Sequence, residues 1–491
     1  MVKSLIFPPP PPPPASDTIT VTASRDFQGS AFFNIAEIQF AGFDYTHATF
    51  SSIQFGPGLI ADNLHVTGDD FRNFINVHLT NGDTEFSAAN WTFSNWVPYN
   101  PYQNDQVTIY GSAAADHITG SSQADGLIGG DGDDVLVGLD GRDQLIGGRG
   151  YDTLIGGDGD DIYRLDTVDA LPISTLSIMP DRNGTVTPLF RTYDKVIEEA
   201  DGGIDTVTVY RVDEVHSYAL PNNVENGAII GTMVNGVQTT STMGAFELFG
   251  NGLANTLTGN NDVNVLGGRE GADTLLGFGG NDTLDGGRGK DILDGGDGID
   301  TASYASAESG VTVSLAITES QNTGFGNDTL ISIENLIGSQ FDDTLIGNDG
   351  DNRINGAVGR DNLIGGRGAD VLQGGGGGDV LSGGAGSDRL VGGGGNDTLS
   401  GGGASDTFIF APNFGKDTIA DFTDTGGGVD DVIDATAFGF VDIGDIARSA
   451  SGLDLVLNFG SGNTITIADY LATHSGNDIL DDILGCRLIK S

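Results

Sequence analysis

The sequence has 491 residues, of which 79 are glycine, and its 69 acidic against 21 basic residues give a formal charge of −48. This charge excludes binding to nucleic-acid phosphates, and it makes a compact fold repel itself unless the fold collects cations. The single cysteine, Cys486, excludes an intrachain disulfide, and no apolar stretch is long enough to span a membrane.

The first part of the chain contains no glycine-rich pattern. Residues 1–15 include seven consecutive prolines, which predict a stiff arm that serves as a spacer or as a ligand for an aromatic groove. Residues 16–110 alternate apolar and β-favouring residues between turn signals, which predicts short strands. The aromatic residues of this module, Trp91, Trp96 and Tyr99, fit two interpretations: a β-sandwich that stacks on glycans, or the core of a cap on the next part of the chain.

From Gly111 onward the chain becomes periodic, with a period of nine residues. Three blocks, at 111–164, 250–303 and 338–409, contain 6, 6 and 8 nonapeptides, and each nonapeptide begins with glycine. The sixth position is Asp in 17 of them and Asn in three, and the eighth is always apolar or aromatic. The connectors at 165–249 and 304–337, and the C-terminal segment at 410–491, read as less regular strands.

The nine-residue unit predicts a turn followed by a minimal strand. In Gly365–Gln373 (GGRGADVLQ), the glycines permit the turn, and the apolar residue at position eight can be buried only if such units stack. Stacking brings the sixth-position carboxylates of same-side turns to about 4.8 Å, the spacing between neighbouring strands. Such a column of anions requires a cation, and Ca²⁺ fits carboxylate and carbonyl oxygens better than Mg²⁺ or Zn²⁺.

Repeats such as GGRGADVLQ and GGGGNDTLS resemble the RTX family, whose pattern is GGxGxDxUx with U a large apolar residue. The resemblance implies an all-β fold of parallel β-roll blocks, with two nonapeptides per coil and Ca²⁺ between neighbouring same-side turns. It also implies a secreted or cell-surface protein exported by a type I system through an uncleaved signal within 410–491. The connector SYASAESGVTVSL and the segment DTFIFAPNFGKDTIADF resemble regions that accompany such repeats in exported proteins.

The expected calcium ligands are the sixth-position aspartates. They are Asp134, Asp143, Asp152, Asp161, Asp273, Asp282, Asp291, Asp300, Asp361, Asp370, Asp379, Asp388, Asp397 and Asp406. The nonapeptides that open each block lack the fourth-position glycine or the aspartate, which makes Asp116, Asp125, Asp343, Asn255, Asn264 and Asn352 weaker candidates. If each ion needs two same-side turns within a block, at most about 14 ions bind and reduce the charge from −48 to about −20.

No catalytic motif stands out. The six histidines do not form HExxH, and no GxSxG is present, so we expect a protein that is not an enzyme; a small carboxylate-based hydrolase in 16–110 is the less favoured alternative. The sequence therefore predicts calcium-dependent folding outside the cell: largely unfolded without the ion and folded at millimolar Ca²⁺. The rival is an adhesin or glycan-binding protein that acts through 16–110.

Overall fold

The computed structural model describes most of the chain as β-structure, with a single short α-helix among the described residues. These are 17–33, 35–41, 46–55, 59–69, 71–80, 83–96, 105–165, 194–200, 202–210, 217–230, 233–234, 237–238, 245–423, 430–439 and 446–473. The predicted proline arm, Tyr99 and Cys486 lie outside them. Two compact units are present: residues 1–215 with 221–230, and residues 216–220 with 231–491.

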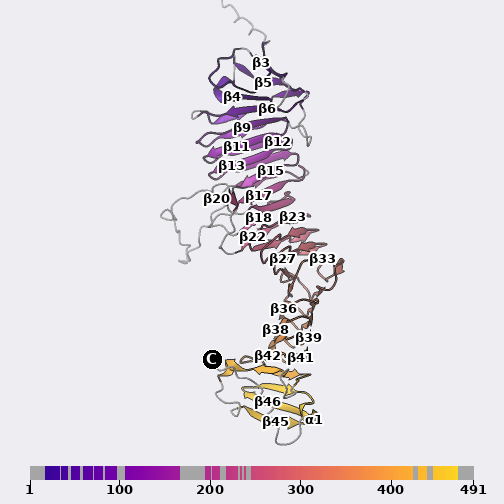
Figure 1. The fold of residues 1–491 in the computed structure, drawn as a ribbon. Coiled ribbons are helices and arrows are strands. Elements are labelled where there is room, and N and C mark those ends of the chain that lie inside the picture. The colour runs from indigo at the N-terminus through magenta and orange to yellow at the C-terminus, as the bar shows by residue number, and fades with distance from the viewer. Residues whose placement is uncertain are drawn as a thin grey trace, which may run out of the picture. The chain divides into compact units, whose positions relative to one another are not determined.

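The first unit consists of three sets of parallel strands stacked as successive rungs (Figure 1). One sheet has the order β1 (Asp17–Val21), β3 (Ile35–Phe40), β5 (Ile60–Thr67), β8 (Thr92–Ser94). A second has the order β7 (Glu85–Ser87), β10 (His117–Thr119), β12 (Val135–Asp140), β14 (Thr153–Asp158), β16 (Lys195–Ile197). The third contains β2 (Arg25–Asp26), β4 (Thr46–Ser51), β6 (Asn73–His78), β9 (Gln106–Tyr110), β11 (Asp125–Asp131), β13 (Gln144–Arg149), β15 (Ile162–Leu165), β17 (Thr206–Tyr210) and β19 (Asn226–Ile230). A 3-10 turn, Ser52–Gln54, follows β4.

The second unit repeats this architecture with longer sheets. One sheet has the order β18 (Ser217–Ala219), β22 (Phe246–Phe249), β24 (Asn264–Gly267), β27 (Thr283–Asp285), β30 (Thr301–Ser303), β34 (Asn335–Ile337), β36 (Arg353–Val358), β38 (Val371–Gly377), β40 (Arg389–Gly395), β42 (Thr407–Ile409), β44 (Val432–Asp434). Opposite it, β23 (Thr256–Thr258), β26 (Thr274–Leu276), β29 (Ile292–Asp294), β33 (Asn327–Ile331) and β32 (Gln321–Asn322) are neighbours in that order. A third sheet begins with β31 (Thr312–Ser314), β35 (Thr344–Ile346), β37 (Asn362–Arg367), β39 (Val380–Ala385), β41 (Thr398–Gly403) and β43 (Lys416–Ile419), in that order.

The C-terminal end of the second unit departs from this pattern. The strand β47 (Asn463–Ile467) pairs in parallel with β43, but β46 (Asp454–Gly460) and β45 (Ala447–Ser451) follow as antiparallel strands. The 3-10 turn Thr436–Phe438 and the helix α1 (Tyr470–Thr473) lie in the same region. Two minor pairs, β20 (Met233–Val234) with β21 (Val237–Gln238) and β25 (Glu270–Gly271) with β28 (Arg288–Gly289), complete the description.

The strand register follows directly from the nine-residue period. Leu127 pairs with Leu145 in one sheet and Leu136 with Leu154 in the other, so each strand pairs with the strand 18 residues later. The eighth-position side chains therefore stack in two inward columns, and these four leucines are completely buried. One coil thus contains two nonapeptides, and the prediction of an all-β fold of stacked parallel strands is confirmed.

The module at 16–110 forms coils of the same kind. Its strands β4, β6 and β9 pair in parallel with one another, and β9 pairs in parallel with β11 of the first repeats. Trp91 stacks on Phe55, with ring centroids 5.6 Å apart, and Trp96 packs against Phe40 and Phe93. Only 3% and 8% of these two tryptophans is exposed, so both rings belong to the core of the coils.

Candidate metal centres

The sixth-position residues form hydrogen-bonded ladders, two in the first unit and four in the second. In the first unit, the backbone N–H of Asp116 donates to Oδ1 of Asp134 at 2.7 Å, and the N–H of Asp134 donates to Oδ1 of Asp152 at 2.7 Å. On the opposite side, Asp125 donates to Asp143 at 2.8 Å and Asp143 donates to Asp161 at 2.7 Å. Each carboxylate therefore accepts a hydrogen bond from a backbone N–H of the preceding turn on the same side.

The second unit contains the same bonds. Here N···Oδ1 distances of 2.7 to 2.9 Å connect Asn255–Asp273–Asp291, Asn264–Asp282–Asp300, Asp343–Asp361–Asp379–Asp397 and Asn352–Asp370–Asp388–Asp406. All fourteen expected ligands thus lie in the ladders, separated from their neighbours by 18 positions.

The second carboxylate oxygen, Oδ2, is buried and has no hydrogen-bond partner in thirteen of the fourteen. These are Asp134, Asp143, Asp161, Asp273, Asp282, Asp291, Asp300, Asp361, Asp370, Asp379, Asp388, Asp397 and Asp406. A buried anionic oxygen without a partner is costly, and natural proteins rarely keep one unless an ion or water meets it. Thirteen such atoms arranged in register indicate a role outside protein–protein hydrogen bonding.

The unpartnered oxygens point at the first glycine of their own nonapeptide. A Cβ built on Gly383 would clash with Oδ2 of Asp388 and lie 2.7 Å from the carbonyl oxygen of Gly401, the equivalent glycine of the next coil. A Cβ built on Gly365 would likewise clash with Oδ2 of Asp370 and lie 2.6 Å from the carbonyl oxygen of Gly383. A carboxylate and a carbonyl from two successive turns therefore converge where only a hydrogen fits, and hard oxygens of both kinds are what Ca²⁺ prefers.

The turns that open the first and third blocks satisfy their carboxylates differently. Oδ2 of Asp343 accepts the N–H of Ser339 at 2.6 Å, while its Oδ1 accepts the hydroxyl of Ser339 at 2.8 Å. Asp116 and Asp125 use Ser112 and Ser121 in the same way. The serine stands at the second position, where interior repeats such as Gly365–Gln373 have glycine. These turns close the ladders with internal bonds.

Burial controls the acid–base behaviour of the interior carboxylates. Desolvation raises the pKa of Asp361 to about 7, and the charges of Asp379 and Asp343 add to the rise while the N–H of Asp343 opposes it. Desolvation likewise raises the pKa of Asp370 and of Asp397 to about 6. Without a counter-ion these groups therefore resist ionisation up to about pH 6 to 7, and a bound divalent cation would remove that penalty.

The ladders continue past the nonapeptides through acids that the sequence pattern did not identify. The N–H of Asp161 donates to Asp205 at 2.8 Å, that of Asp291 to Asp328 at 3.2 Å, and that of Asp397 to Asp417 at 3.0 Å. Asp406 is covered in the same way by Asp431, at 2.9 Å. Three of these acids follow the pattern Gly-x-Asp-Thr-apolar, the second half of a nonapeptide, and that shorter signal would have found them.

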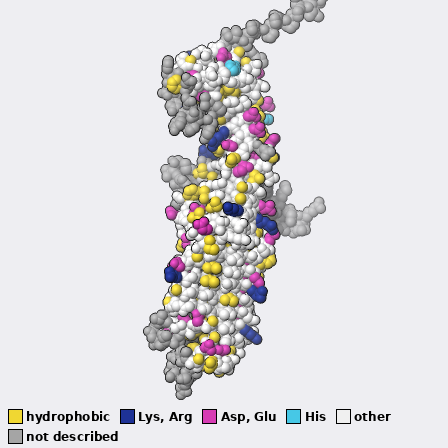
Figure 2. All heavy atoms as spheres, turned by 90° about the vertical axis from the view of Figure 1, so that its right-hand side faces the viewer, with side chains coloured by type: hydrophobic (Ala, Val, Ile, Leu, Met, Phe, Trp, Pro, Cys, Tyr) yellow, Lys and Arg dark blue, Asp and Glu magenta, His cyan; other side chains and the backbone are white. Residues whose placement is uncertain are grey.

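Burial of the ladders explains how so acidic a chain presents a mixed surface. Asp361, Asp370 and Asp397 are at most 2% exposed. On the face in Figure 2, backbone and uncharged side chains cover most of the surface, and the acidic side chains are scattered among them. Several of those at the surface meet arginines, as Asp342 meets Arg360 at 2.9 Å.

Fold and turns together define a parallel β-roll built from glycine- and aspartate-rich nonapeptides, with carboxylates aligned along its turns. These nonapeptides are RTX calcium-binding repeats, and the chain contains several copies of them. The family described as RTX calcium-binding nonapeptide repeat (4 copies) matches residues 108–136, 137–167, 249–277, 267–302, 337–372 and 373–408.

Comparisons with solved structures and with curated proteins add less to this assignment. Among solved structures, the chain is similar to the extracellular lipase LipA from Serratia marcescens, with 18% identity and a TM-score of 0.17. The similarity covers 52% of this chain and 45% of the lipase chain, so the chain matches less than half of that protein's length. No curated protein matches the sequence. Within the described residues, none of the helices has the length and apolar character needed to cross a membrane.

Proposed function

We propose that the chain binds a series of Ca²⁺ ions between successive same-side turns, with the fourteen sixth-position aspartates from Asp134 to Asp406 as its anionic ligands. The observation that carries this proposal is the column of buried Oδ2 atoms without partners, eight of which converge with a glycine carbonyl of the next coil on the first glycine of their nonapeptide. The donor set consists only of oxygens and comes from backbone and side chains of two turns, which suits a cation with six to eight flexible ligands.

The proposed number of ions exceeds the count made within separate blocks. Fourteen was the limit if every turn pair had to lie inside one block. Because Asp205, Asp328 and Asp417 extend the ladders beyond the blocks, pairs such as Asp161 with Asp205 add to this number. Turns closed by Ser112, Ser121 and Ser339 bind more weakly, because their carboxylate oxygens already have partners.

Calcium binding on this scale is coupled to folding. The ladders bring like charges to neighbouring turns, and the unfolded chain contains no preformed sites, so binding free energy becomes folding free energy. Extracellular calcium modules bind at about 0.1 to 1 mM, which leaves such a chain loose in the cytosol and ordered outside the cell. This behaviour suits a secreted or cell-surface protein that passes through a type I exporter before it folds.

Circular dichroism and calorimetry of the full chain test the proposal. Chelated protein should give a largely unfolded spectrum, and millimolar Ca²⁺ should produce a β-spectrum together with heat from many equivalents of ion. A spectrum that does not change upon calcium addition would rule the proposal out. Export is tested separately: residues 412–491 fused to a reporter should leave the cell only when a type I transporter is present.

The adhesive interpretation of residues 16–110 receives less support. Its proposed stacking groups Trp91 and Trp96 are in the core, and Tyr99 lies outside the described residues. A glycan array probed with the calcium-loaded chain separates the two interpretations. Binding to glycans through these rings would support the adhesive interpretation, whereas a core role predicts no such binding.

A further inference from the structure

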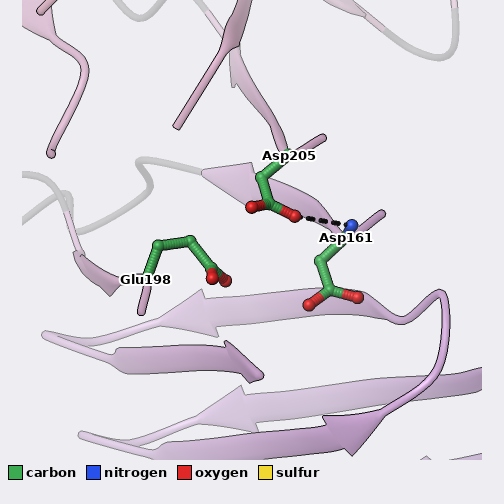
Figure 3. Close-up of side chains that lie close together, drawn as sticks. All are labelled: Asp161, Glu198 and Asp205. Atoms are coloured by element: carbon green, nitrogen blue, oxygen red, sulfur yellow. Dashed lines mark hydrogen bonds between the residues drawn. The ribbon is translucent and has the colours of Figure 1, made fainter. Parts of the chain in front are cut away.

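Three buried carboxylates meet where the first run of repeats ends, and only one of them belongs to a nonapeptide. Asp161 lies directly before β15, Asp205 lies directly before β17, and Glu198 follows β16 (Figure 3). One ligand oxygen from each lies within 4.8 Å of those of the other two. All three belong to the first unit, and no repeat motif predicts the presence of Glu198.

Glu198 occupies a register position that elsewhere belongs to the first glycine of a nonapeptide. Ile155 pairs with Ile197, which places Glu198 beside Gly156 in the next coil. The space against the α-carbon of Gly156 is occupied by Oδ2 of Asp161, the hydroxyl of Tyr163 and Oε1 of Glu198. In the interior repeats a carbonyl oxygen completes this space, so Glu198 brings a full negative charge to a place where other coils have a dipole.

The described residues do not neutralise the three carboxylates. Asp161 and Asp205 are each 1% exposed, and their Oδ2 atoms have no hydrogen-bond partner. Their Oδ1 atoms accept the N–H groups of Asp143 at 2.7 Å and of Asp161 at 2.8 Å. Glu198, 8% exposed, accepts the hydroxyl of Tyr163 and the N–H of Glu199. Among the described residues, no salt bridge involves any of the three.

We propose that Asp161, Glu198 and Asp205 bind one Ca²⁺ at a site distinct in composition from those of the repeats. This inference rests on the proposed function, because it takes the same ion in the same roll. Three carboxylates converge here instead of two, and affinity for Ca²⁺ rises with the number of charged ligands, so this site fills before the others. The hydroxyl of Tyr163 donates to Oε1 of Glu198 and so holds the glutamate in place, while the second lone pair of Oε1 stays available to the ion.

The position of the ligands in the sequence indicates which segments of the chain the ion would hold together. Asp161 and its ladder partner Asp205 are 44 positions apart in the sequence, compared with 18 between ordinary ladder partners, and residues 166–193 between them lie outside the described residues. The ion therefore joins segments that are farther apart along the chain than those of an ordinary coil. Bringing such segments together costs more conformational entropy than adding an ordinary coil, and binding of the ion offsets part of that cost.

Hydrogen exchange of the full chain, followed by mass spectrometry over a Ca²⁺ titration, tests the site locally. In the Glu198→Gln variant, peptides that cover β16 and β17 should need about ten-fold more Ca²⁺ to become protected, as expected when one charged ligand is lost. Glu199→Gln is the matched control: it removes the same charge from an exposed neighbour and should behave as wild type. Peptides that cover β37 to β41 should respond identically in all three proteins and report that the variants fold.

The metal-free state separates a ligand from a structural hydrogen-bond acceptor. Without Ca²⁺, Glu198→Gln removes repulsion between carboxylates, so β16 and β17 should be at least as protected as in wild type. Lower protection both with and without Ca²⁺, or a titration identical to wild type, would overturn the inference. If Glu198→Gln loses protection throughout the chain, Asp205→Asn provides the same comparison. If no peptide of wild type responds to Ca²⁺, the proposed function itself fails, which is a distinct result.

Discussion

Acid should replace calcium as a folding agent for this chain, because the ladder carboxylates need either a cation or a proton. Desolvation raises the pKa of Asp361 to about 7 and that of Asp370 and Asp397 to about 6, from an ordinary value of 3.8. The folded state therefore holds more protons than the unfolded state in this range. Stability of the metal-free protein is greatest below the ordinary pKa and is lost as pH rises through about 6 to 7.

The size of the effect follows from these shifts. Between about pH 7.5 and pH 5, Asp361 contributes about 2 to 3 kcal/mol, and Asp370 and Asp397 contribute about 1 to 2 kcal/mol each. If the three titrate independently, acidification stabilises the metal-free second unit by about 5 kcal/mol, which is comparable to the whole stability of many domains. At about pH 5 the protein is above the isoelectric point of about 4.1 that its composition gives, so it keeps a negative charge.

Urea unfolding at a series of pH values measures this effect. With protein and buffers passed over a chelating resin, the urea midpoint should rise as pH falls from about 7.5 to 5. With saturating Ca²⁺ the slope should reverse, since protons compete with the ion for the same oxygens. A metal-free midpoint that stays constant, or that falls on acidification, would refute the idea that uncompensated ladder carboxylates limit folding.

Four further outcomes are expected. Gly383→Ala places a methyl against Oδ2 of Asp388 and should raise the Ca²⁺ concentration needed for folding, as followed by circular dichroism. Gly376→Ala, whose methyl meets no atom within 4 Å, should leave that concentration unchanged. Equal folding midpoints for the two variants would argue against the convergence of oxygens on the first glycine. Leu381→Ala removes a side chain that is 1% exposed from the leucine column and should cost about 2 to 5 kcal/mol in urea unfolding of the calcium-loaded protein, and a cost near zero would mean that the column is loosely packed. Ala357 has a left-handed backbone with φ of 74°. Ala357→Gly should relieve about 1 kcal/mol of strain and so raise the melting temperature, and a lower melting temperature would be the contrary result. Acrylamide should quench the fluorescence of Trp91 and Trp96 only weakly in the loaded protein, and strong quenching would contradict their burial.

The sequence contains enough information to predict the repeat region almost completely. A strict period of nine with an apolar eighth position specifies stacked two-strand coils, and the register of Leu363 with Leu381 follows from it. The alignment of the fourteen aspartates in the ladders was predictable because glycine and aspartate stand at fixed places in a turn of fixed length, while their role as ligands stays a prediction. The missing glycine of the opening turns was also visible in the sequence, although the serine that bonds to their carboxylates, such as Ser339, was not recognised.

The coils outside the repeats could not be predicted in the same way. In the N-terminal module, Ala48 pairs with Ile75 and Ile75 with Val107, so successive coils differ in length and leave no period to detect. A coil held by aromatic packing does not need a turn of constant length, whereas a metal-binding turn does. Glu198 was missed for a related reason: it replaces a glycine only in space, through the pairing of β16 with β14, and no sequence spacing reveals this.

The ladder bonds also make the two ends of a roll unequal. In every ladder the donor is the earlier residue and the acceptor is the later one, as in the bond from Asp379 to Asp397. Removing the preceding coil leaves a carboxylate oxygen without its N–H donor, whereas removing the following coil leaves an N–H without its carboxylate acceptor. Each coil is thus completed by its successor, and Asp417 and Asp431 end the series by supplying acceptors without being nonapeptides. A roll shortened from its C-terminal side therefore loses the residues that supply these last acceptors, whereas one shortened from its N-terminal side keeps them.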